Sequence, residues 1–186
     1  LTNLFLLKYR IVSYLFITLS YLIGSINFAY IVAKYKKLDI SSSGSGNPGS
    51  SNVMRIIGKK YAAIVLVGDV FKGFLPIFLF DENLLLCGFA AVIGHIYPIF
   101  YKFKGGKGVA TYIGVYIAFS TLNPFSYDLF ENSYFLFLNI PLFAVFYFVV
   151  FKITRISAIA SLLTVFISNL ILFNSFNLFQ DRLVVF

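Results

Sequence analysis

Long apolar runs alternate with short polar segments along this chain of 186 residues. Hydropathy predicts about six membrane spans, at residues 11–33, 61–80, 84–101, 108–123, 134–151 and 156–173. The first run is long enough to cross a bilayer and no small-residue cleavage site follows it, so it is not a secretory signal peptide. We therefore predict an all-α integral membrane protein, a compact multi-span helical bundle that forms a single domain over residues 1–186.

The composition supports a membrane protein. Hydrophobic residues make up 60% of the chain and charged residues 12%, and the mean hydropathy is +0.89. A soluble domain of this length could not bury so much apolar surface, so we expect lipid to be the solvent. Cys87 is the single cysteine, which excludes an intramolecular disulfide.

The positions of the charges predict the orientation in the membrane. A net charge of +8 would suggest a nucleic-acid partner for a soluble protein, but here we expect no nucleic acid to bind. Eleven of the 15 basic residues lie in alternate loops: Lys34, Lys36, Lys37, Arg55, Lys59, Lys60, Lys102, Lys104, Lys107, Lys152 and Arg155. The other loops contain Asp81, Glu82, Asp128 and Glu131. The positive-inside rule then predicts cytoplasmic basic loops and an N-terminus outside.

Three ionisable residues lie in or near the predicted spans. Asp69 and Lys72 are three positions apart and so share a helical face. Isolated charges are costly in hydrocarbon, so the two should pair or face a polar cavity, and a buried structural ion pair is favoured over direct catalysis. His95, the only histidine, has either a structural or a catalytic role. With no second histidine and no carboxylate at ligand spacing, we expect no metal site.

Two segments, 44–55 and 94–111, carry most of the polar chemistry. The first lies in the longest polar stretch, 34–60, whose Gly, Ser, Asn and Pro residues are incompatible with a regular helix. The second contains Lys104-Gly105-Gly106-Lys107-Gly108. Glycines beside lysines leave backbone amides accessible next to fixed cations, an arrangement that binds phosphate. The two segments predict a membrane enzyme that handles phosphorylated substrates.

Other motif interpretations fail. Gly44-x-Gly46-x-x-Gly49 matches a dinucleotide fingerprint but follows a membrane span, without a βαβ unit. The glycine-lysine run is not a Walker A loop, because Gly108 stands where Ser or Thr would bind magnesium. A plausible serine triad is absent, and Phe100 replaces the aspartate of the His-x4-Asp motif of acyl-CoA-dependent acyltransferases. A merely solvated basic loop is the remaining alternative, and the glycine density argues against it.

The same segments carry a resemblance to one family. They include Tyr21-Leu22-Ile23-Gly24-Ser25-Ile26, Gly44-Ser45-Gly46-Asn47, Ser51-Asn52-Val53-Met54-Arg55, Gly58-Lys59-Lys60, Asp69-Val70-Phe71-Lys72-Gly73, Gly94-His95, Phe103-Lys104-Gly105-Gly106-Lys107-Gly108-Val109-Ala110-Thr111 and, more weakly, Thr154-Arg155-Ile156-Ser157. In identity and spacing, over roughly residues 20–165, the chain resembles the bacterial acyl-phosphate:glycerol-3-phosphate acyltransferases, the PlsY family.

The resemblance implies roles for individual residues. It makes Ser45 and Arg55 the catalytic pair, and we add Asn47, His95 and Lys104 as further candidate catalytic residues. It makes the loop 104–108 the glycerol-3-phosphate site. The candidate phosphate-binding residues are Gly105, Gly106, Lys107, Gly108, Thr111, Asn52 and Ser157. No metal or other cofactor is expected.

The chain departs from the family pattern near its end. Ile156 stands where the family has an aromatic residue. The family continues into a seventh span and a cytoplasmic segment with a His, an Asn and a Glu, whereas this sequence stops at Phe186. We therefore expect a shortened chain with six spans, a C-terminus outside and reduced activity.

The predicted function is transfer of a fatty acyl group from acyl phosphate to the 1-hydroxyl of sn-glycerol-3-phosphate, giving lysophosphatidic acid for phospholipid synthesis. The alternative is a non-catalytic transporter or scaffold that binds organic phosphates, which would favour repeat symmetry and midplane polar residues. We expect a monomer in the bacterial cytoplasmic (inner) membrane. Its partners would be both substrates, the lipid bilayer and, as a functional neighbour, the enzyme that produces acyl phosphate.

Overall fold

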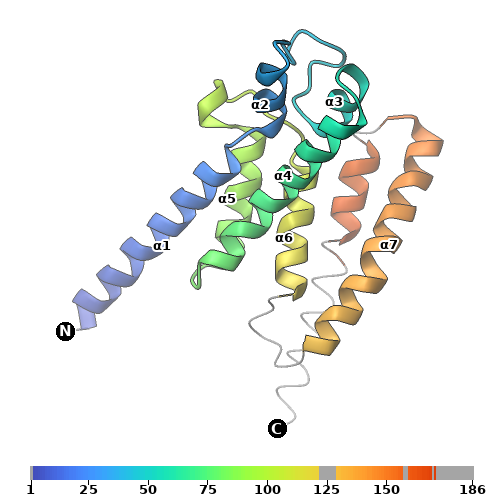
Figure 1. The fold of residues 1–186 in the computed structure, drawn as a ribbon. Coiled ribbons are helices and arrows are strands. Elements are labelled where there is room, and N and C mark those ends of the chain that lie inside the picture. The colour runs from blue at the N-terminus through green and yellow to red at the C-terminus, as the bar shows by residue number, and fades with distance from the viewer. Residues whose placement is uncertain (1, 122–128, 157–158, 169, 171–186) are drawn as a thin grey trace. The chain divides into compact units, whose positions relative to one another are not determined.

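The computed structural model describes residues 2–121, 129–156, 159–168 and 170, and these residues are helical or irregular, without a strand. The chain divides into two compact units, Leu1–Tyr127 and Asp128–Phe186. The prediction of one domain over 1–186 stays a prediction. The first unit contains α1 (Thr2–Gly24), α2 (Phe28–Tyr35), α3 (Ser50–Ile56), α4 (Lys59–Leu79), α5 (Leu84–Ile96), a 3-10 turn η1 (Ile99–Tyr101) and α6 (Val109–Thr121) (Figure 1).

The helices coincide with the predicted apolar runs. Among the residues that the structure describes, three segments are long and apolar enough to cross a membrane: Arg10–Tyr35, Lys59–Leu79 and Leu84–Tyr101. Shorter apolar helices cover Val109–Phe119, Pro141–Thr154 and Ile159–Ser168. Large apolar side chains point outward, including Val67 and Leu85, which are 67% and 77% exposed. An apolar outer surface over buried polar groups is the arrangement that lipid solvent favours.

The first predicted span, 11–33, falls within the candidate membrane span Arg10–Tyr35, but two helices rather than one form it. The structure interrupts it after Gly24, and a second helix begins at Phe28. The Asn27 side-chain oxygen accepts hydrogen bonds from the amides of Ala29 and Tyr30, at 3.0 and 3.2 Å, and so caps α2. Ser25 and Asn27 are fully buried. The break therefore brings polar backbone into the protein interior rather than into lipid.

Glycines allow two helix pairs to approach closely. A Cβ at Gly24 of α1 would collide with the Ala91 backbone of α5. A Cβ at Gly73 of α4 would collide with the Thr111 backbone of α6, and Gly114 of α6 has the same relation to Val70 of α4. Small residues at such crossings let helix backbones pack against each other in membranes. These crossings set α5 and α6, which flank the second polar loop, against α1 and α4.

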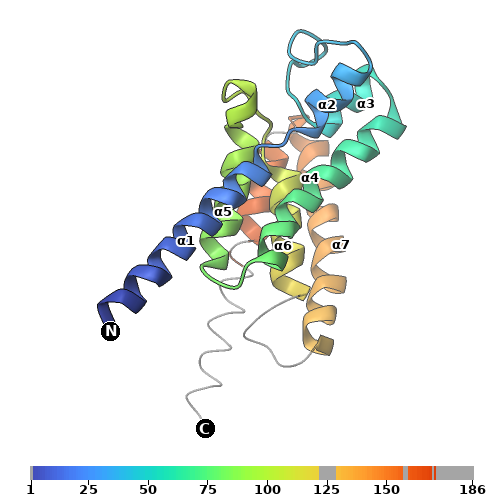
Figure 2. The ribbon, with the colours of Figure 1, turned by 60° about the vertical axis from the view of Figure 1, so that its left-hand side comes forward.

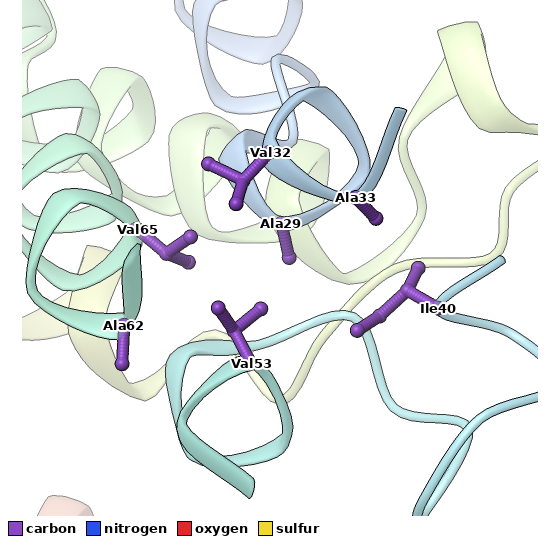
Figure 3. Packing of buried hydrophobic residues seen from close by; sticks show 7 residues of the cluster. All are labelled: Ala29, Val32, Ala33, Ile40, Val53, Ala62 and Val65. Atoms are coloured by element: carbon purple, nitrogen blue, oxygen red, sulfur yellow. The ribbon is translucent and has the colours of Figure 1, made fainter. Parts of the chain in front are cut away.

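The two polar loops lie at the same end of this unit, together with α2 and α3 (Figures 1 and 2). The Gly/Ser/Asn/Pro cluster is irregular up to Gly49, as predicted, and a short helix, α3, then begins at Ser50. A buried apolar cluster holds α2 and α3 against the start of α4 (Figure 3): Ala29, Val32, Ala33, Ile40, Val53, Ala62 and Val65. The cluster fixes both ends of residues 44–49, the first loop, because Ile40 lies before this loop and Val53 lies after it in α3.

The second unit is described by two helical segments. Helix α7 runs from Leu129 to Thr154 and contains Pro141, and an apolar helix covers Ile159–Ser168. Arg155 between them has a left-handed backbone, with φ of 59°. Ser157, a predicted phosphate-binding residue, lies outside the described residues.

Candidate active site

The first loop is held in shape by the side chain of Asn52. Asn52 is buried in α3, its side-chain oxygen accepts the Ser45 amide at 2.9 Å, and its side-chain nitrogen donates to the Ser43 carbonyl at 2.9 Å. Glycines on either side of Ser45, Gly44 and Gly46, have φ of 62° and 70°, which permits the tight turn. These bonds give Asn52 a structural role in the loop, and its predicted phosphate contact stays a prediction.

Three residues of segment 44–55 are proposed for catalysis, and two of them lie on the protein surface. Ser45 and Arg55 are exposed, and Asn47 is half-buried. Arg55 lies on α3, three positions after Asn52 and hence on the same side of the helix. Among the residues that the structure describes, Ser45 and Arg55 make no direct hydrogen bond, and Arg55 has no carboxylate partner. The guanidinium is therefore available to an anionic ligand.

Two glycines of the second loop pack on His95 at the end of α5. A Cβ on Gly105 would collide with the His95 carbonyl, and a Cβ on Gly106 would collide with the Nε2 end of the His95 ring. The Gly106 amide donates to the His95 carbonyl at 3.1 Å. The Gly106 N–H is thus used inside the protein, and a phosphate contact at Gly106 stays a prediction. The glycines are needed here for close packing as well as for any phosphate contact.

The second loop also carries two lysines and leads into the first turn of α6. Lys104 and Lys107 are exposed, and Gly108, with φ of 79°, leads into α6. The first amides of a helix have no partner within it and lie at the positive end of its dipole. Gly108 and the start of α6 therefore place N–H donors beside two lysines, which is the arrangement expected of a phosphate site.

Thr111 lies deeper than the sequence predicted. Its side chain is fully buried where α6 crosses α4, and its hydroxyl has no hydrogen-bond partner among the described residues. Gly73 of α4 packs against the Thr111 backbone, so this turn of α6 lies in the interface between the two helices. The Thr111 hydroxyl therefore does not reach the loop surface. Its predicted contact with a substrate phosphate stays a prediction.

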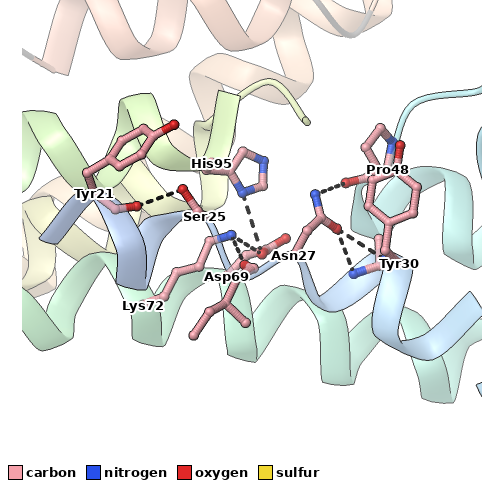
Figure 4. A network of polar contacts seen from close by, with 10 residues as sticks. Tyr21, Ser25, Asn27, Tyr30, Pro48, Asp69, Lys72 and His95 are labelled. Carbon is pink, nitrogen blue, oxygen red and sulfur yellow. Dashed lines mark hydrogen bonds and ion pairs between the residues drawn. The ribbon is translucent and has the colours of Figure 1, made fainter. Parts of the chain in front are cut away.

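Beneath both loops lies a buried ion cluster (Figure 4). The Asp69 Oδ1 atom is 3.0 Å from Lys72 Nζ and 3.5 Å from His95 Nδ1. The three residues are 1%, 2% and 3% exposed. Lys72 Nζ also donates to the Ile26 carbonyl at the break between α1 and α2. The predicted Asp69–Lys72 pair is confirmed, and His95 joins it.

Sequence reasoning placed Asn27 among the small and polar residues of the first span, but it missed two roles of its side chain. Besides capping α2, its side-chain nitrogen donates to the Pro48 carbonyl of the first loop at 3.5 Å. An Asn immediately before an apolar helix is a signal for an N-cap, but the apolar residues on both sides concealed it within one predicted span. Its contact with Pro48 depends on the fold and has no local signal.

The linker before the first loop is ordered by local polar contacts. The Ser41 hydroxyl and amide, together with Ser42, hydrogen-bond to Asp39 and hold the pKa of its carboxyl below the ordinary range. A hydrogen bond with the Tyr61 side chain raises the pKa of Lys36, whose Nζ lies 4.3 Å from the centre of that ring. Both linker residues therefore stay charged near neutral pH.

These features define an integral membrane protein with basic, glycine-rich loops at one end of its helices. The glycerol-3-phosphate acyltransferase family model matches residues 14–186, and the chain belongs to this family. The predicted all-helical membrane fold and family are confirmed.

Known relatives agree with this assignment. A glycerol-3-phosphate acyltransferase of Aquifex aeolicus (strain VF5) is 46% identical over 108 residues, which cover 54% of this chain and 56% of the relative. The chain spans a little over half the length of the curated relatives that it matches first.

Two crystal structures of PlsY (YgiH), an integral membrane glycerol 3-phosphate acyltransferase, share the fold. The glycerol 3-phosphate form is 34% identical with a TM-score of 0.69, covering 87% of this chain and 76% of that one. The lysophosphatidic acid form is 32% identical with a TM-score of 0.68, covering 92% and 82%.

Proposed function

We propose that this chain transfers a fatty acyl group from acyl phosphate to the 1-hydroxyl of sn-glycerol-3-phosphate and releases lysophosphatidic acid. The observation that carries the proposal is the position of two loops with exposed cations at the same end of the helices, on a fold shared with the glycerol 3-phosphate form of a crystallised acyltransferase. Phosphate on both substrates requires several cations and N–H donors in one place. Arg55, Lys104, Lys107 and the start of α6 supply them.

The reaction balances without a cofactor. The acceptor hydroxyl oxygen attacks the acyl carbonyl carbon, and the bond from that carbon to the phosphate oxygen breaks. The hydroxyl proton passes to a substrate phosphate, whose second pKa is about 6, and inorganic phosphate leaves. Because the donor is a mixed anhydride, the leaving group is already good. The main task of the protein is to hold two mutually repelling anions in line, which effective molarity and fixed positive charge accomplish.

The residues divide this task between the loops. Ser45 and Asn47 orient the acceptor hydroxyl, and Arg55 binds phosphate from α3. Lys104, Lys107 and Gly108 bind the glycerol-3-phosphate phosphate from the second loop. The apolar outer faces of the helices allow the acyl chain of the donor to remain in lipid while its phosphate reaches the loops.

The proposed setting is the bacterial cytoplasmic membrane, with the basic loops in the cytoplasm and the N-terminus outside. The concentration of Lys and Arg in alternate loops supports this orientation. We propose a monomer that receives its donor from an acyl-phosphate-producing enzyme. Single cysteines placed in a cysteine-free background at Lys36 and at Asp81 should be labelled from opposite sides of sealed vesicles.

A radiolabelled acceptor tests the function. Purified protein in lipid nanodiscs is incubated with labelled glycerol-3-phosphate and either palmitoyl phosphate or palmitoyl-CoA, and lysophosphatidic acid is measured. Label should enter lipid with the acyl phosphate and not with the CoA thioester. Saturable binding of glycerol-3-phosphate without any lipid product would overturn the proposal in favour of the non-catalytic alternative.

A further inference from the structure

One carboxylate oxygen, Asp69 Oδ1, contacts two side chains, and each of these connects it to a different polar loop through a series of contacts, called a chain of contacts below. It contacts Lys72 Nζ at 3.0 Å and His95 Nδ1 at 3.5 Å, from residues of α4 and α5. The catalytic chemistry proposed above uses none of these buried groups in contact with substrate. Their burial in a membrane protein is expensive unless the charges compensate each other.

The first chain of contacts leads to the second loop. The His95 ring faces Asp69 with Nδ1, and its Nε2 end lies against Gly106. Neither His95 Nδ1 nor Asp69 Oδ1 has a hydrogen-bond partner among the described residues, and the 3.5 Å contact between them is electrostatic. The His95 backbone carbonyl accepts the Gly106 amide at 3.1 Å. Ring and carbonyl together form the surface on which Gly105 and Gly106 turn, so a rotation of the ring would move the loop that carries Lys104 and Lys107.

The second chain of contacts leads to the first loop. Lys72 Nζ donates to the Ile26 carbonyl in the break between α1 and α2. The next residue, Asn27, caps α2 and donates to the Pro48 carbonyl, which belongs to the loop that carries Ser45. The position of this loop therefore depends on the same buried pair. Figure 4 shows His95 and Lys72 meeting at Asp69, and Asn27 reaching Pro48.

We propose that Asp69 is a positioning residue that fixes the two polar loops relative to each other, through His95 on one side and Lys72 on the other. The proposal rests on the proposed function for its kinetic consequence, since acyl transfer requires the acceptor held by one loop to face groups on the other. A packed apolar residue could stabilise α4 equally well, but it could not orient an imidazole and an ammonium at once.

Hydrogen exchange of the protein in nanodiscs tests the arrangement without activity. Asp69→Asn keeps the side-chain shape and should speed amide exchange in both segments, 44–49 and 103–108. His95→Asn should affect 103–108 alone, and Asn27→Ala should affect 44–49 and the start of α2 alone. Glu82→Gln is the matched control, because its carboxylate accepts a hydrogen bond from Ser13 near the opposite end of the helices. It should change neither segment.

Kinetics provide the second readout. Asp69→Asn and His95→Asn should each lower kcat/KM for glycerol-3-phosphate by about 10- to 100-fold, mainly through KM, since a misplacement near 1 Å has effects of this size. The double variant should lose about as much as Asp69→Asn alone, because both substitutions act through one contact. Losses that multiply would mean that the two residues act independently, and would overturn the proposal.

The proposal can still be tested if Asp69→Asn fails to insert or if the wild-type protein is inactive. If Asp69→Asn does not insert, Asp69→Asn with Lys72→Met removes both charges and takes its place. Wild-type exchange in both segments in that double variant would overturn the proposal, because packing alone would then suffice. If the wild-type protein transfers no acyl group, the proposed function fails, while the exchange pattern still decides whether Asp69 connects the loops.

Discussion

The side-chain oxygen of Asn52 accepts the backbone amide of Ser45 at 2.9 Å, so a buried helical residue sets the conformation of an exposed loop. The nitrogen of the same side chain donates to the Ser43 carbonyl. The side-chain amide of Asn52 therefore connects both ends of the turn that contains Ser45. Its oxygen is needed for the bond to Ser45 and its nitrogen for the bond to Ser43. An Asp or a Leu of similar size could satisfy at most one of the two bonds.

Asn52→Ala should release this turn. Loss of two part-buried hydrogen bonds, which leaves their backbone partners without Asn52, should cost about 1–3 kcal/mol of local stability. We expect transfer to fall about tenfold or more, with faster amide exchange at 43–46 and normal membrane insertion. Asn52→Asp should be intermediate in exchange, since it keeps the acceptor for Ser45. Met54→Leu, an exposed change on the same helix, should match the wild type in both measurements.

Arg55→Ala should remove one charge-assisted phosphate contact. Such a contact is worth about 1.5–3 kcal/mol, which corresponds to a roughly 10- to 150-fold loss of kcat/KM. Arg55→Lys should recover only part of it, because an ammonium lacks the bidentate geometry of a guanidinium. The thermal midpoint should stay near the wild-type value, since Arg55 is exposed. Normal turnover in Arg55→Ala would remove Arg55 from the site.

Gly106→Ala should raise KM for glycerol-3-phosphate more than KM for acyl phosphate. The new Cβ meets the Nε2 end of the His95 ring, so the loop must shift away from α5. Gly58→Ala is an informative comparison, because Gly58 has φ of 118° but no atom near its added Cβ. Gly58→Ala should lower stability through backbone strain and leave both KM values unchanged. An exclusive rise in donor KM for Gly106→Ala would assign the loop to the other substrate.

Gly73→Ala and Gly114→Ala should each destabilise the fold. Either Cβ collides with backbone of the partner helix, Thr111 in one case and Val70 in the other, and backbone cannot move aside as a side chain can. Overpacking costs about 1–3 kcal/mol or more. A lower thermal midpoint in detergent, measured by intrinsic fluorescence, is the expected result. The two substitutions combined should be less than additive, because one separation of α4 from α6 relieves both clashes.

Acid should loosen the linker that precedes the first loop. Hydrogen bonds from Ser41 and Ser42 lower the pKa of Asp39 in the folded protein, so this contribution is complete above the unfolded pKa and is lost as pH falls through the folded pKa. Exchange at the Ser41 amide, corrected for its intrinsic pH dependence, should therefore rise below the usual aspartate range. Asp39→Asn should abolish that extra rise. An identical profile in both proteins would show that the Asp39 contacts do not order the linker.

The sequence alone determined the membrane-embedded helices, the family and the two polar segments. Runs of apolar residues have few alternatives in lipid, because each backbone amide must find its partner within the same helix. The spacing of Gly, Ser, Asn and Arg in the motifs is likewise local information. The Asp69–Lys72 pair was predictable for the same reason, since three positions along a helix bring two side chains together.

The tertiary structure decided what these residues contact. The break at Ser25–Asn27, the burial of Thr111, and the use of the Gly106 amide by His95 all depend on which helices cross and how closely. Helix crossings are set by small residues on two distant segments at once, and no local pattern specifies which glycine meets which backbone. For that reason the sequence could name His95 and Asp69 separately, and only the packing of α4 against α5 could place them beside each other.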